Sequence, residues 1–357
     1  MQRNIISFKG QKIFIGIDVH KNTWQVTSLT ETGMKKTHPQ KASAKELYDF
    51  LNRHYPEGEY LAVYEAGFSG FSTYYALKEQ GIGCIVINAA DVPTSQYESV
   101  MKSDKVDSEK LAKTLRSGDL KCIYIREKEN LDDRSLVRIR SNIVKDLSAY
   151  RHRIRHLLLT HGVDLPERFA SMSNCWCRAF IQWLKNDVCL LSSTRRSLDM
   201  LLAQVESIRT NLLKITLQIR HLAKEGKYRE NFDLLFSIPG IGKITAMTLL
   251  TEIYDISRFH NEREFASYLG LIPTSHSSGD KVIHGEKTFR GNKQLGPLLI
   301  EASWVAIRKD PGLSSAYVNY LKKMKPQQAI VRIARKLSNI IFAVLRTKRK
   351  YVSVNDN

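Results

Sequence analysis

Four acidic residues stand where they could share a metal ion. Asp18 ends the apolar segment FIGID, which predicts a buried strand, and Glu65 lies near the end of a second such segment, YLAVYEAG. Asp104 and Asp107 are three residues apart in a predicted helix, so their carboxylates share one face. Clustered carboxylates repel one another unless a cation neutralises them. Oxygen ligands suit Mg²⁺ or Mn²⁺, and the set therefore predicts a magnesium or manganese site.

Each acid taken alone has a simpler interpretation. Asp18 by itself would be a cap or turn residue after a strand, and either helical aspartate by itself would lie on a solvated face. The whole set, in a basic chain and in this strand and helix context, favours metal binding. A pair of such ions can stabilise the attacking and leaving oxygens of a phosphodiester.

A second candidate for chemistry is the polar segment GLIPTSHSSGDKVIHGEKTFRGN, residues 270–292, which we expect to be a long loop. Long loops in compact domains are often functional. A serine beside a flexible glycine, near basic residues, could be a nucleophile that faces a phosphate. The basic residues of this segment that could contact phosphate are Lys281, Lys287 and Arg290. By composition alone, the segment also fits a plain surface turn.

The stretch SIPGIGKITA, residues 237–246, fits a helix-hairpin-helix turn. Gly240 and Gly242 would allow a tight turn, and the N–H groups that open the next helix could then point at a phosphate. Lys243 and Thr245 could add donors to a contact that is independent of base sequence. An ordinary connection between two helices explains the stretch equally well.

The charge balance indicates a polyanionic partner. The chain has 55 Lys and Arg against 36 Asp and Glu, a net charge of +19. Nucleic acid is the first expectation and an acidic membrane surface the second. From Arg308 to Lys350 there are 12 basic residues and one acidic residue. A basic amphipathic helix is predicted in this region, and its candidate phosphate contacts are Arg332, Arg335 and Lys336; a merely soluble basic face is the alternative.

The elements that must position these residues fall into three predicted parts. Strand and helix signals alternate in the first part and indicate a mixed α/β sheet. A long basic helix follows over residues 130–161, and apolar residues then recur every three or four positions from Leu198 to Leu222. This spacing predicts a coiled coil, within the chain or between protomers, with an amphipathic helix on a globular core as the alternative. The predicted domains are residues 1–128, 129–228 and 229–357, the last of them mostly helical.

Composition also bears on the compartment. An odd number of cysteines, five, favours reduced thiols in a cytosol. No apolar run is long enough to span a membrane, and the first residues, MQRNIISFKGQK, are too short and polar for a secretory signal. We therefore expect a cytoplasmic protein that associates with the bacterial nucleoid when active.

Five segments carry a family resemblance, and they occur in a fixed order: FIGIDVHK, YEAG, KSDKVDSEKLA, SIPGIG and YLGLIP…SSG…GN. Together they resemble the DEDD-type insertion-sequence transposases, which pair a RuvC-like domain with a C-terminal serine-bearing domain and act as bridge-RNA-guided DNA recombinases. The resemblance spans about residues 12–345, and the set is specific as a group, although no single segment is.

The resemblance implies an RNase H-like fold for the first domain, with Asp18, Glu65, Asp104 and Asp107 as the acid tetrad that binds Mg²⁺. By position, Ser278 matches the catalytic serine, with Ser277 as the second choice. The serine would attack a DNA phosphodiester and form a covalent intermediate. The resemblance further implies a homo-oligomer and a structured guide RNA from the flank of the element, which would pair with donor and target DNA.

The sequence therefore predicts a Mg²⁺-dependent, RNA-guided transposase of a mobile insertion sequence. Two alternatives stay open at this point. One is a RuvC-like junction endonuclease in which metal-activated water attacks and no serine adduct forms. The other is a basic scaffold that binds nucleic acid without cutting it.

Overall fold

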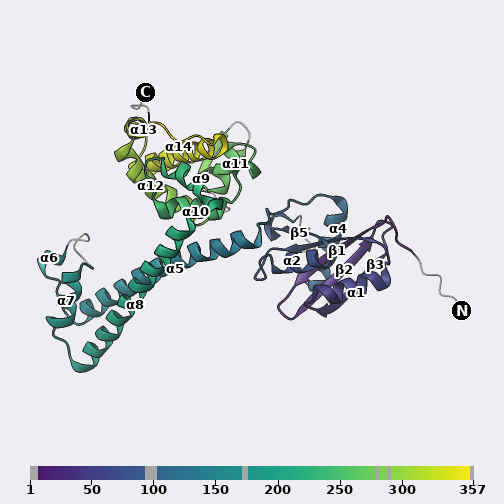
Figure 1. The fold of residues 1–357 in the computed structure, drawn as a ribbon, viewed down its shortest axis with the longest axis horizontal. Helices are drawn as coiled ribbons and strands as arrows, with labels where there is room; N and C mark the ends of the chain where they lie inside the picture. The colour runs from purple at the N-terminus through teal and green to yellow at the C-terminus, as the bar shows by residue number, and fades with distance from the viewer. Residues whose placement is uncertain (1–6, 93–102, 171–175, 279–280, 288–290, 354–357) are drawn as a thin grey trace. The chain divides into compact units, whose positions relative to one another are not determined.

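The computed structural model describes residues 7–92, 103–170, 176–278, 281–287 and 291–353, and it divides into two compact units, Met1–Ile125 and Arg126–Asn357 (Figure 1). The finer division of the second unit into residues 129–228 and 229–357 stays a prediction.

The first unit is a mixed five-stranded sheet with helices, as the alternating pattern predicts. Its strands are β1 (Lys12–Val19), β2 (Thr23–Thr30), β3 (Lys35–Lys41), β4 (Glu59–Glu65) and β5 (Gly83–Ile87), in the spatial order β3-β2-β1-β4-β5. β1 is antiparallel to β2 and parallel to β4, and β4 is parallel to β5. The helices are α1 (Ala44–His54), α2 (Ser72–Glu79) and α4 (Asp104–Ser117), with the short η1 (Ala89–Asp91).

The two faces of β1 have different neighbours. Ile13, Ile15 and Ile17 lie in the core shared with α1 and α2. Because side chains alternate along a strand, Phe14 and Gly16 lie on the opposite face, where Phe14 packs with Ala112 of α4. A Cβ on Gly16 would lie 2.0 Å from the Ser108 carbonyl oxygen. The bare glycine therefore lets α4 lie directly on the sheet.

The second unit begins with two long helices, α5 (Lys128–Thr160) and α8 (Ser192–Leu222), which pack along each other (Figure 1). The short helices α6 (Glu167–Ala170) and α7 (Arg178–Asn186) contribute Phe169 and Phe180 to a core with both long helices. The apolar repeat lies on one helix, as both the predicted coiled coil and the alternative of an amphipathic helix require. Part of that repeat, including Leu198, Val205 and Ile219, is buried within this chain. Whether α8 also forms a coiled coil stays a prediction.

The rest of the second unit is a helical globule, as predicted. It contains α9 (Gly226–Phe236), α10 (Lys243–Ile253), η2 (Ile256–Arg258), α11 (Glu262–Tyr268), α12 (Leu295–Lys309), α13 (Pro311–Leu321) and α14 (Pro326–Thr347). α10 is buried along most of its length and lies at the centre of the globule's apolar core. Among the helices of the described ranges, none combines the length and apolar character that a membrane crossing requires.

One expectation about this globule is wrong. Residues 270–292 were expected to form a loop, but they contain a two-stranded antiparallel hairpin of β6 (Pro273–Ser278) and β7 (Lys281–Lys287). Serine and glycine are poor strand formers by propensity, so the composition suggests a loop. Backbone pairing between the strands outweighs that local preference.

Candidate functional site

The first two predicted acids lie on the same face of the sheet, on neighbouring strands. Asp18 follows Gly16 by two residues and therefore faces α4. β4 pairs with β1 in parallel, with Ile17 opposite Tyr64, so the next residues along are Asp18 and Glu65. Tyr64 lies in the core on the far face, which places Glu65 on the α4 side. Both carboxylates thus stand at the carboxyl ends of two adjacent parallel strands.

The other two acids come from the first turn of α4. Ser103 caps this helix by accepting a hydrogen bond from the Val106 N–H, and Asp104 and Asp107 follow. The contact at Gly16 and a buried hydrogen bond of 2.9 Å between the Thr27 and Ser108 hydroxyls hold α4 against the sheet. The start of the helix is therefore fixed over the end of β1.

Burial and the negative charges of Asp104 and Asp107 affect the pKa of the Asp18 carboxyl group. Burial raises the pKa of Asp18; His20 lowers it, and Asp104 and Asp107 raise it, with a net rise. The crowding predicted from the sequence is thus present for three of the four acids. Negative charges gathered in this way favour binding of a cation.

His20 is a member of the cluster that the sequence argument missed. Its Nε2 lies 3.3 Å from Asp18 Oδ2 and 3.2 Å from Asp104 Oδ2, so it bridges the two carboxylates. Asp18, His20 and Asp104 each offer one ligand atom, and these atoms lie within 4.8 Å of one another. The position of His20 two residues after Asp18 was the available signal. His20 lies one residue beyond the end of β1, so the alternation along the strand reaches it only if the strand is expected to extend to that residue.

A nearby acid serves as a contrast. Glu109 of α4 points away from the cluster and forms ion pairs with Lys35 and Lys113, each at 2.8 Å. These partners lower the pKa of Glu109, mainly through the hydrogen bonds from Lys113 and Lys35. On α4, Glu109 is thus paired with lysines, whereas Asp104 and Asp107 lie close to another carboxylate, that of Asp18.

The predicted nucleophile lies in the hairpin. Ser278 is the last residue of β6 and pairs through its backbone with Lys281, while Ser277 pairs with Val282. Lys287, at the other end of β7, pairs with Pro273. Arg290, a further predicted phosphate contact, lies outside the described residues.

The two ends of the hairpin meet at a point that we call the hairpin neck, formed by Gly270, Leu271, Gly291 and Asn292. A Cβ on Gly291 would lie 2.3 Å from the Gly270 Cα, so the two chain segments touch. The Asn292 N–H also donates to the Tyr268 carbonyl oxygen at 2.7 Å. The Gly-Asn pair noted in the sequence therefore has a structural reason: it closes the base of the hairpin.

The Pro-Gly-Ile-Gly turn joins α9 to α10. Gly240 has a φ of +86°, and a Cβ there would lie 2.4 Å from the Ala302 carbonyl oxygen, so its main observed role is close packing on α12. Gly242 is the N-cap of α10 and provides no side-chain cap. Thr245 is half-buried. Contact of this turn with phosphate stays a prediction.

Lys243 lies on the surface next to a small basic pocket. The pocket has a volume of about 220 Å³, and its cationic lining comes from Lys243, Arg220 and Lys224, with His221 beside them, over an apolar floor that includes Phe232 and Met247. Arg220 also faces Arg140 of α5; burial, and then this neighbour, lowers the pKa of Arg140. Like charges held close together favour an anion between them.

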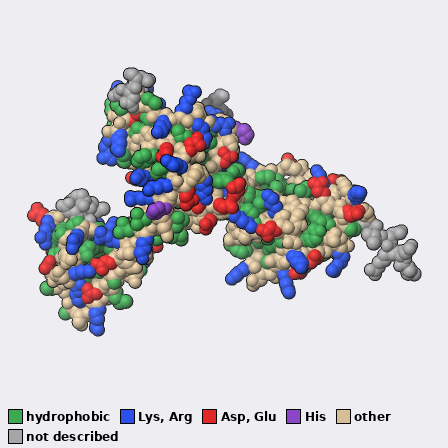
Figure 2. Space-filling model, in the orientation of Figure 1, with side chains coloured by type: hydrophobic (Ala, Val, Ile, Leu, Met, Phe, Trp, Pro, Cys, Tyr) green, Lys and Arg blue, Asp and Glu red, His purple; other side chains and the backbone are tan. Residues whose placement is uncertain are grey.

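The predicted basic helix is α14. Arg332 and Lys336 are exposed, whereas Arg335 is half-buried and donates to the Glu262 carbonyl oxygen at 3.1 Å. Figure 2 shows further Lys and Arg side chains over the visible face of the helical globule. Arg335 therefore has a structural partner within the chain, and the other two are free to face solvent.

Comparisons with known proteins agree with this arrangement. Residues 15–162 match a family model of DEDD transposases of the IS110 type, described as "Transposase". Residues 232–318 match a second model, described as "Transposase IS116/IS110/IS902 family". The first match covers the acid cluster and the second covers the serine hairpin. The chain belongs to the DEDD-type insertion-sequence transposases.

Some individual relatives match this DEDD-type transposase over more of its length than the family models do. It is 27% identical over 350 residues to the transposase for insertion sequence element IS1533 of Leptospira borgpetersenii, covering 95% of this chain and 98% of that one. It is 27% identical to the protein y4qE of Sinorhizobium fredii over 68% of this chain, but it spans only 57% of that relative's length. It is 37% identical to the pilin gene-inverting protein of Moraxella lacunata, over 38% of this chain and 42% of that protein.

A DEDD-type transposase domain implies the use of a divalent metal, and the residues present fit one. The donors are carboxylate oxygens, which hard divalent cations prefer. Their mutual repulsion in the first unit is the chemical situation that such a cation relieves. The enzyme is a DNA transposase.

Proposed function

We propose that this transposase cuts and rejoins DNA through a covalent link to Ser278, with Mg²⁺ held by the acid tetrad. The observation that carries the proposal is the convergence of Asp18, Asp104 and Asp107, with Glu65 on the neighbouring strand, at the edge of the sheet. The sheet order, with two acids at the ends of adjacent parallel strands, supports an RNase H-like, or RuvC-like, fold for the first unit.

In the proposed reaction, the Ser278 Oγ attacks the phosphorus of a DNA phosphodiester. A bond forms between Oγ and phosphorus, the bond from phosphorus to one deoxyribose oxygen breaks, and the hydroxyl proton passes to the leaving oxygen through solvent. One phosphate ester bond replaces another, so the bond energy is conserved. A deoxyribose hydroxyl can then attack the serine-linked phosphorus, release the serine and rejoin the strand. When bound, Mg²⁺ would neutralise charge that develops on the phosphate oxygens. Lys281 pairs with Ser278 across the hairpin and would hold the phosphate near the serine, whereas Lys287 lies at the other end of β7.

We further propose that a structured guide RNA selects the DNA sites, and that the enzyme works as a dimer or tetramer through the region of α5 and α8. The net charge of +19 suits contacts with nucleic-acid backbones that are independent of sequence. Exposed apolar side chains on α8, including Leu213 and Leu217, leave part of that helix available to a partner helix. The relationship to a pilin gene-inverting protein supports the rejoining half of the reaction.

The proposal predicts a DNA–protein adduct. The purified enzyme is incubated with Mg²⁺, labelled DNA that spans the joined ends of the element, and RNA from its noncoding flank. We expect a protein-linked DNA band on a denaturing gel, and we expect Ser278→Ala to abolish it while Ser277→Ala retains it. Cleavage without a linked band, unchanged in Ser278→Ala, would mean that water is the nucleophile. Binding without cleavage in every variant would identify a scaffold.

A second expected result concerns the basic pocket. If Lys243 contacts a nucleic-acid phosphate, Lys243→Ala should reduce the slope of log affinity against log salt by about 1, whatever the DNA sequence. The measurement is fluorescence anisotropy with labelled DNA over a salt series. Lys185→Ala is the matched control, because Lys185 is paired with Glu206 at 2.6 Å on another part of the unit. An equal change of slope in both variants would argue against a specific contact at Lys243.

A further inference from the structure

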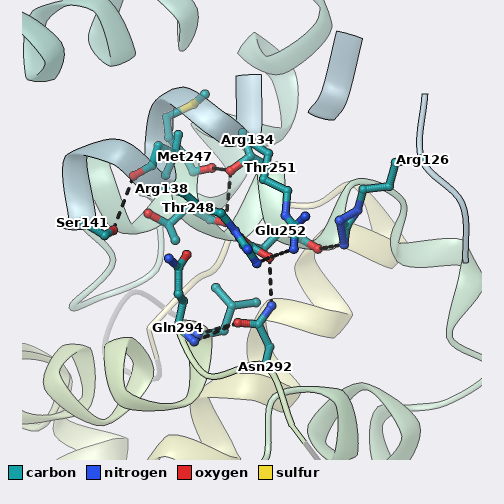
Figure 3. Close-up of polar contacts among 12 residues, drawn as sticks. Arg126, Arg134, Arg138, Ser141, Met247, Thr248, Thr251, Glu252, Asn292 and Gln294 are labelled. Atoms are coloured by element: carbon teal, nitrogen blue, oxygen red, sulfur yellow. Dashed lines mark hydrogen bonds and ion pairs between the residues drawn. The ribbon is translucent and has the colours of Figure 1, made fainter. Parts of the chain in front are cut away.

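The hairpin neck is tied to the rest of the unit by one side chain. The Asn292 amide Nδ2 donates to Glu252 Oε2 at 2.9 Å and to the Tyr268 hydroxyl at 3.1 Å. Its carbonyl Oδ1 accepts from the backbone N–H groups of Gln294 and Leu295, at 2.9 Å and 3.1 Å, and so caps α12 (Figure 3). One residue thus combines two roles that can be separated chemically: an acceptor that caps a helix and a donor that reaches Glu252.

Glu252 is a charged group at the centre of the fold. It lies near the end of α10 and is 0% exposed. Arg138 Nε reaches its Oε1 at 2.6 Å, and Arg134 reaches its Oε2 at 3.0 Å, both from α5 (Figure 3). The backbone carbonyl of Glu252 accepts from the Tyr268 hydroxyl at 2.7 Å and also from Arg126. A single residue therefore joins α5, α10, α11 and the hairpin neck.

Glu252 remains ionised in this position. Burial alone raises the pKa of the carboxyl group, but the hydrogen bonds and charges of Arg138 and Arg134 outweigh it and lower the pKa to about 2. A buried ion pair is often no more stabilising than a well-packed apolar group, so stability alone does not account for this arrangement. The hydrogen bonds between Glu252 and the two arginines are charge-assisted and directional, so they fix the positions of the groups that they join.

We propose that Glu252 and Asn292 are positioning residues that hold the serine hairpin at a fixed angle to α5 and α10. The inference deepens the proposed function, since it rests on Ser278 acting from that hairpin. Because the neck is closed by the Gly270–Gly291 contact, its orientation determines where β6, the strand that ends at Ser278, begins. The hydrogen bond from Asn292 to Glu252 fixes that orientation, and the two arginines fix Glu252. A displacement of α5 would then be transmitted to the strand that carries the serine.

The two roles of Asn292 give a clean test. Asn292→Asp retains an oxygen that caps α12, but it replaces the donor to Glu252 with an oxygen that repels the carboxylate. Asn292→Ala removes both roles. Asp133→Asn is the matched control on α5: Asp133 pairs with Lys227 at 2.7 Å and with the Tyr228 hydroxyl at 2.8 Å, away from the neck. Glu252→Gln leaves two guanidinium groups facing a neutral side chain and is kept as a supporting variant.

The measurement is amide hydrogen exchange across the full chain, together with the rate of adduct formation. We expect exchange in β6 and β7 to increase about tenfold in both Asn292 variants, with α9 and α10 unchanged, because a hydrogen bond to a charged group is lost. In the DNA reaction, we expect kcat for adduct formation to fall while KM for DNA stays within about twofold.

Three results would overturn the proposal. Unchanged exchange in both variants would show that the neck does not depend on this bond. An increase in Asn292→Ala alone would assign Asn292 to capping only. An equal increase in Asp133→Asn would indicate general loosening. A wild-type chain that forms no adduct would instead refute the serine mechanism, and the exchange data would still decide the positioning role.

Discussion

Replacing Asp18 with Asn is expected to remove divalent-metal binding from the first unit and to reduce DNA cleavage by at least about 10³-fold. The carboxylate loses its charge but keeps its size, so the effect isolates electrostatics. A metal ion that stabilises the charge of a phosphoryl transition state contributes several kcal/mol, and each 1.36 kcal/mol is a factor of ten in rate. Asp18, near the end of β1, lies within reach of Asp104 in the first turn of α4, so an ion shared by the two carboxylates would lie between them.

The loss of metal binding is measured by titration calorimetry with Mn²⁺ and Mg²⁺, a measurement that does not depend on DNA cleavage by the enzyme. The matched control is Glu109→Gln, which neutralises an acid on the same helix that is paired with Lys35 and Lys113 and points away from the cluster. We expect Glu109→Gln to bind metal as the wild type does. Unchanged metal affinity in Asp18→Asn would show that the cluster is not the metal site.

Replacing Gly16 with Ala is expected to destabilise the first unit by roughly 3 kcal/mol, the upper part of the usual range for overpacking. The added methyl group would lie 2.0 Å from the Ser108 carbonyl oxygen and 2.5 Å from the Ala112 backbone nitrogen. Both are backbone atoms of α4 and cannot turn aside. The helix must move away from the sheet, and Asp104 and Asp107 would move with it, so metal affinity should fall as well.

Thermal unfolding and hydrogen exchange of β1 and α4 check this result. Gly67→Ala is the control in the same unit, because the nearest atom to its added methyl group is 3.9 Å away. We expect Gly67→Ala to unfold close to the wild-type temperature. A Gly16→Ala chain with wild-type stability and metal affinity would contradict the view that this glycine sets the distance between α4 and the sheet.

The acid cluster could be predicted because its determinants are local. Apolar alternation predicts β1 and β4, and a carboxylate at the end of each is visible in the sequence. The spacing of Asp104 and Asp107 predicts one helix face. His20 was missed because its role depends on the exact place where β1 ends, and element ends are the least certain part of a sequence-based prediction.

The serine region could be predicted only in part, for a different reason. Ser278 was found through residue type and family resemblance, but the hairpin around it was expected to be a loop. The network around Glu252 joins residues from Arg126 to Asn292. No local period connects positions so far apart in the chain. Gly240 shows the same limit, because its packing against Ala302 is a tertiary contact that a turn motif does not reveal.

The serine mechanism is tested most directly by locating the DNA on the protein. The reaction with Mg²⁺, guide RNA and element-end DNA is quenched, digested with nuclease and protease, and analysed by tandem mass spectrometry. We expect a nucleotide remnant on Ser278 alone, and we expect it to be absent without metal and absent in Asp18→Asn. A remnant on another residue, or cleaved DNA with no modified peptide, would contradict the serine mechanism.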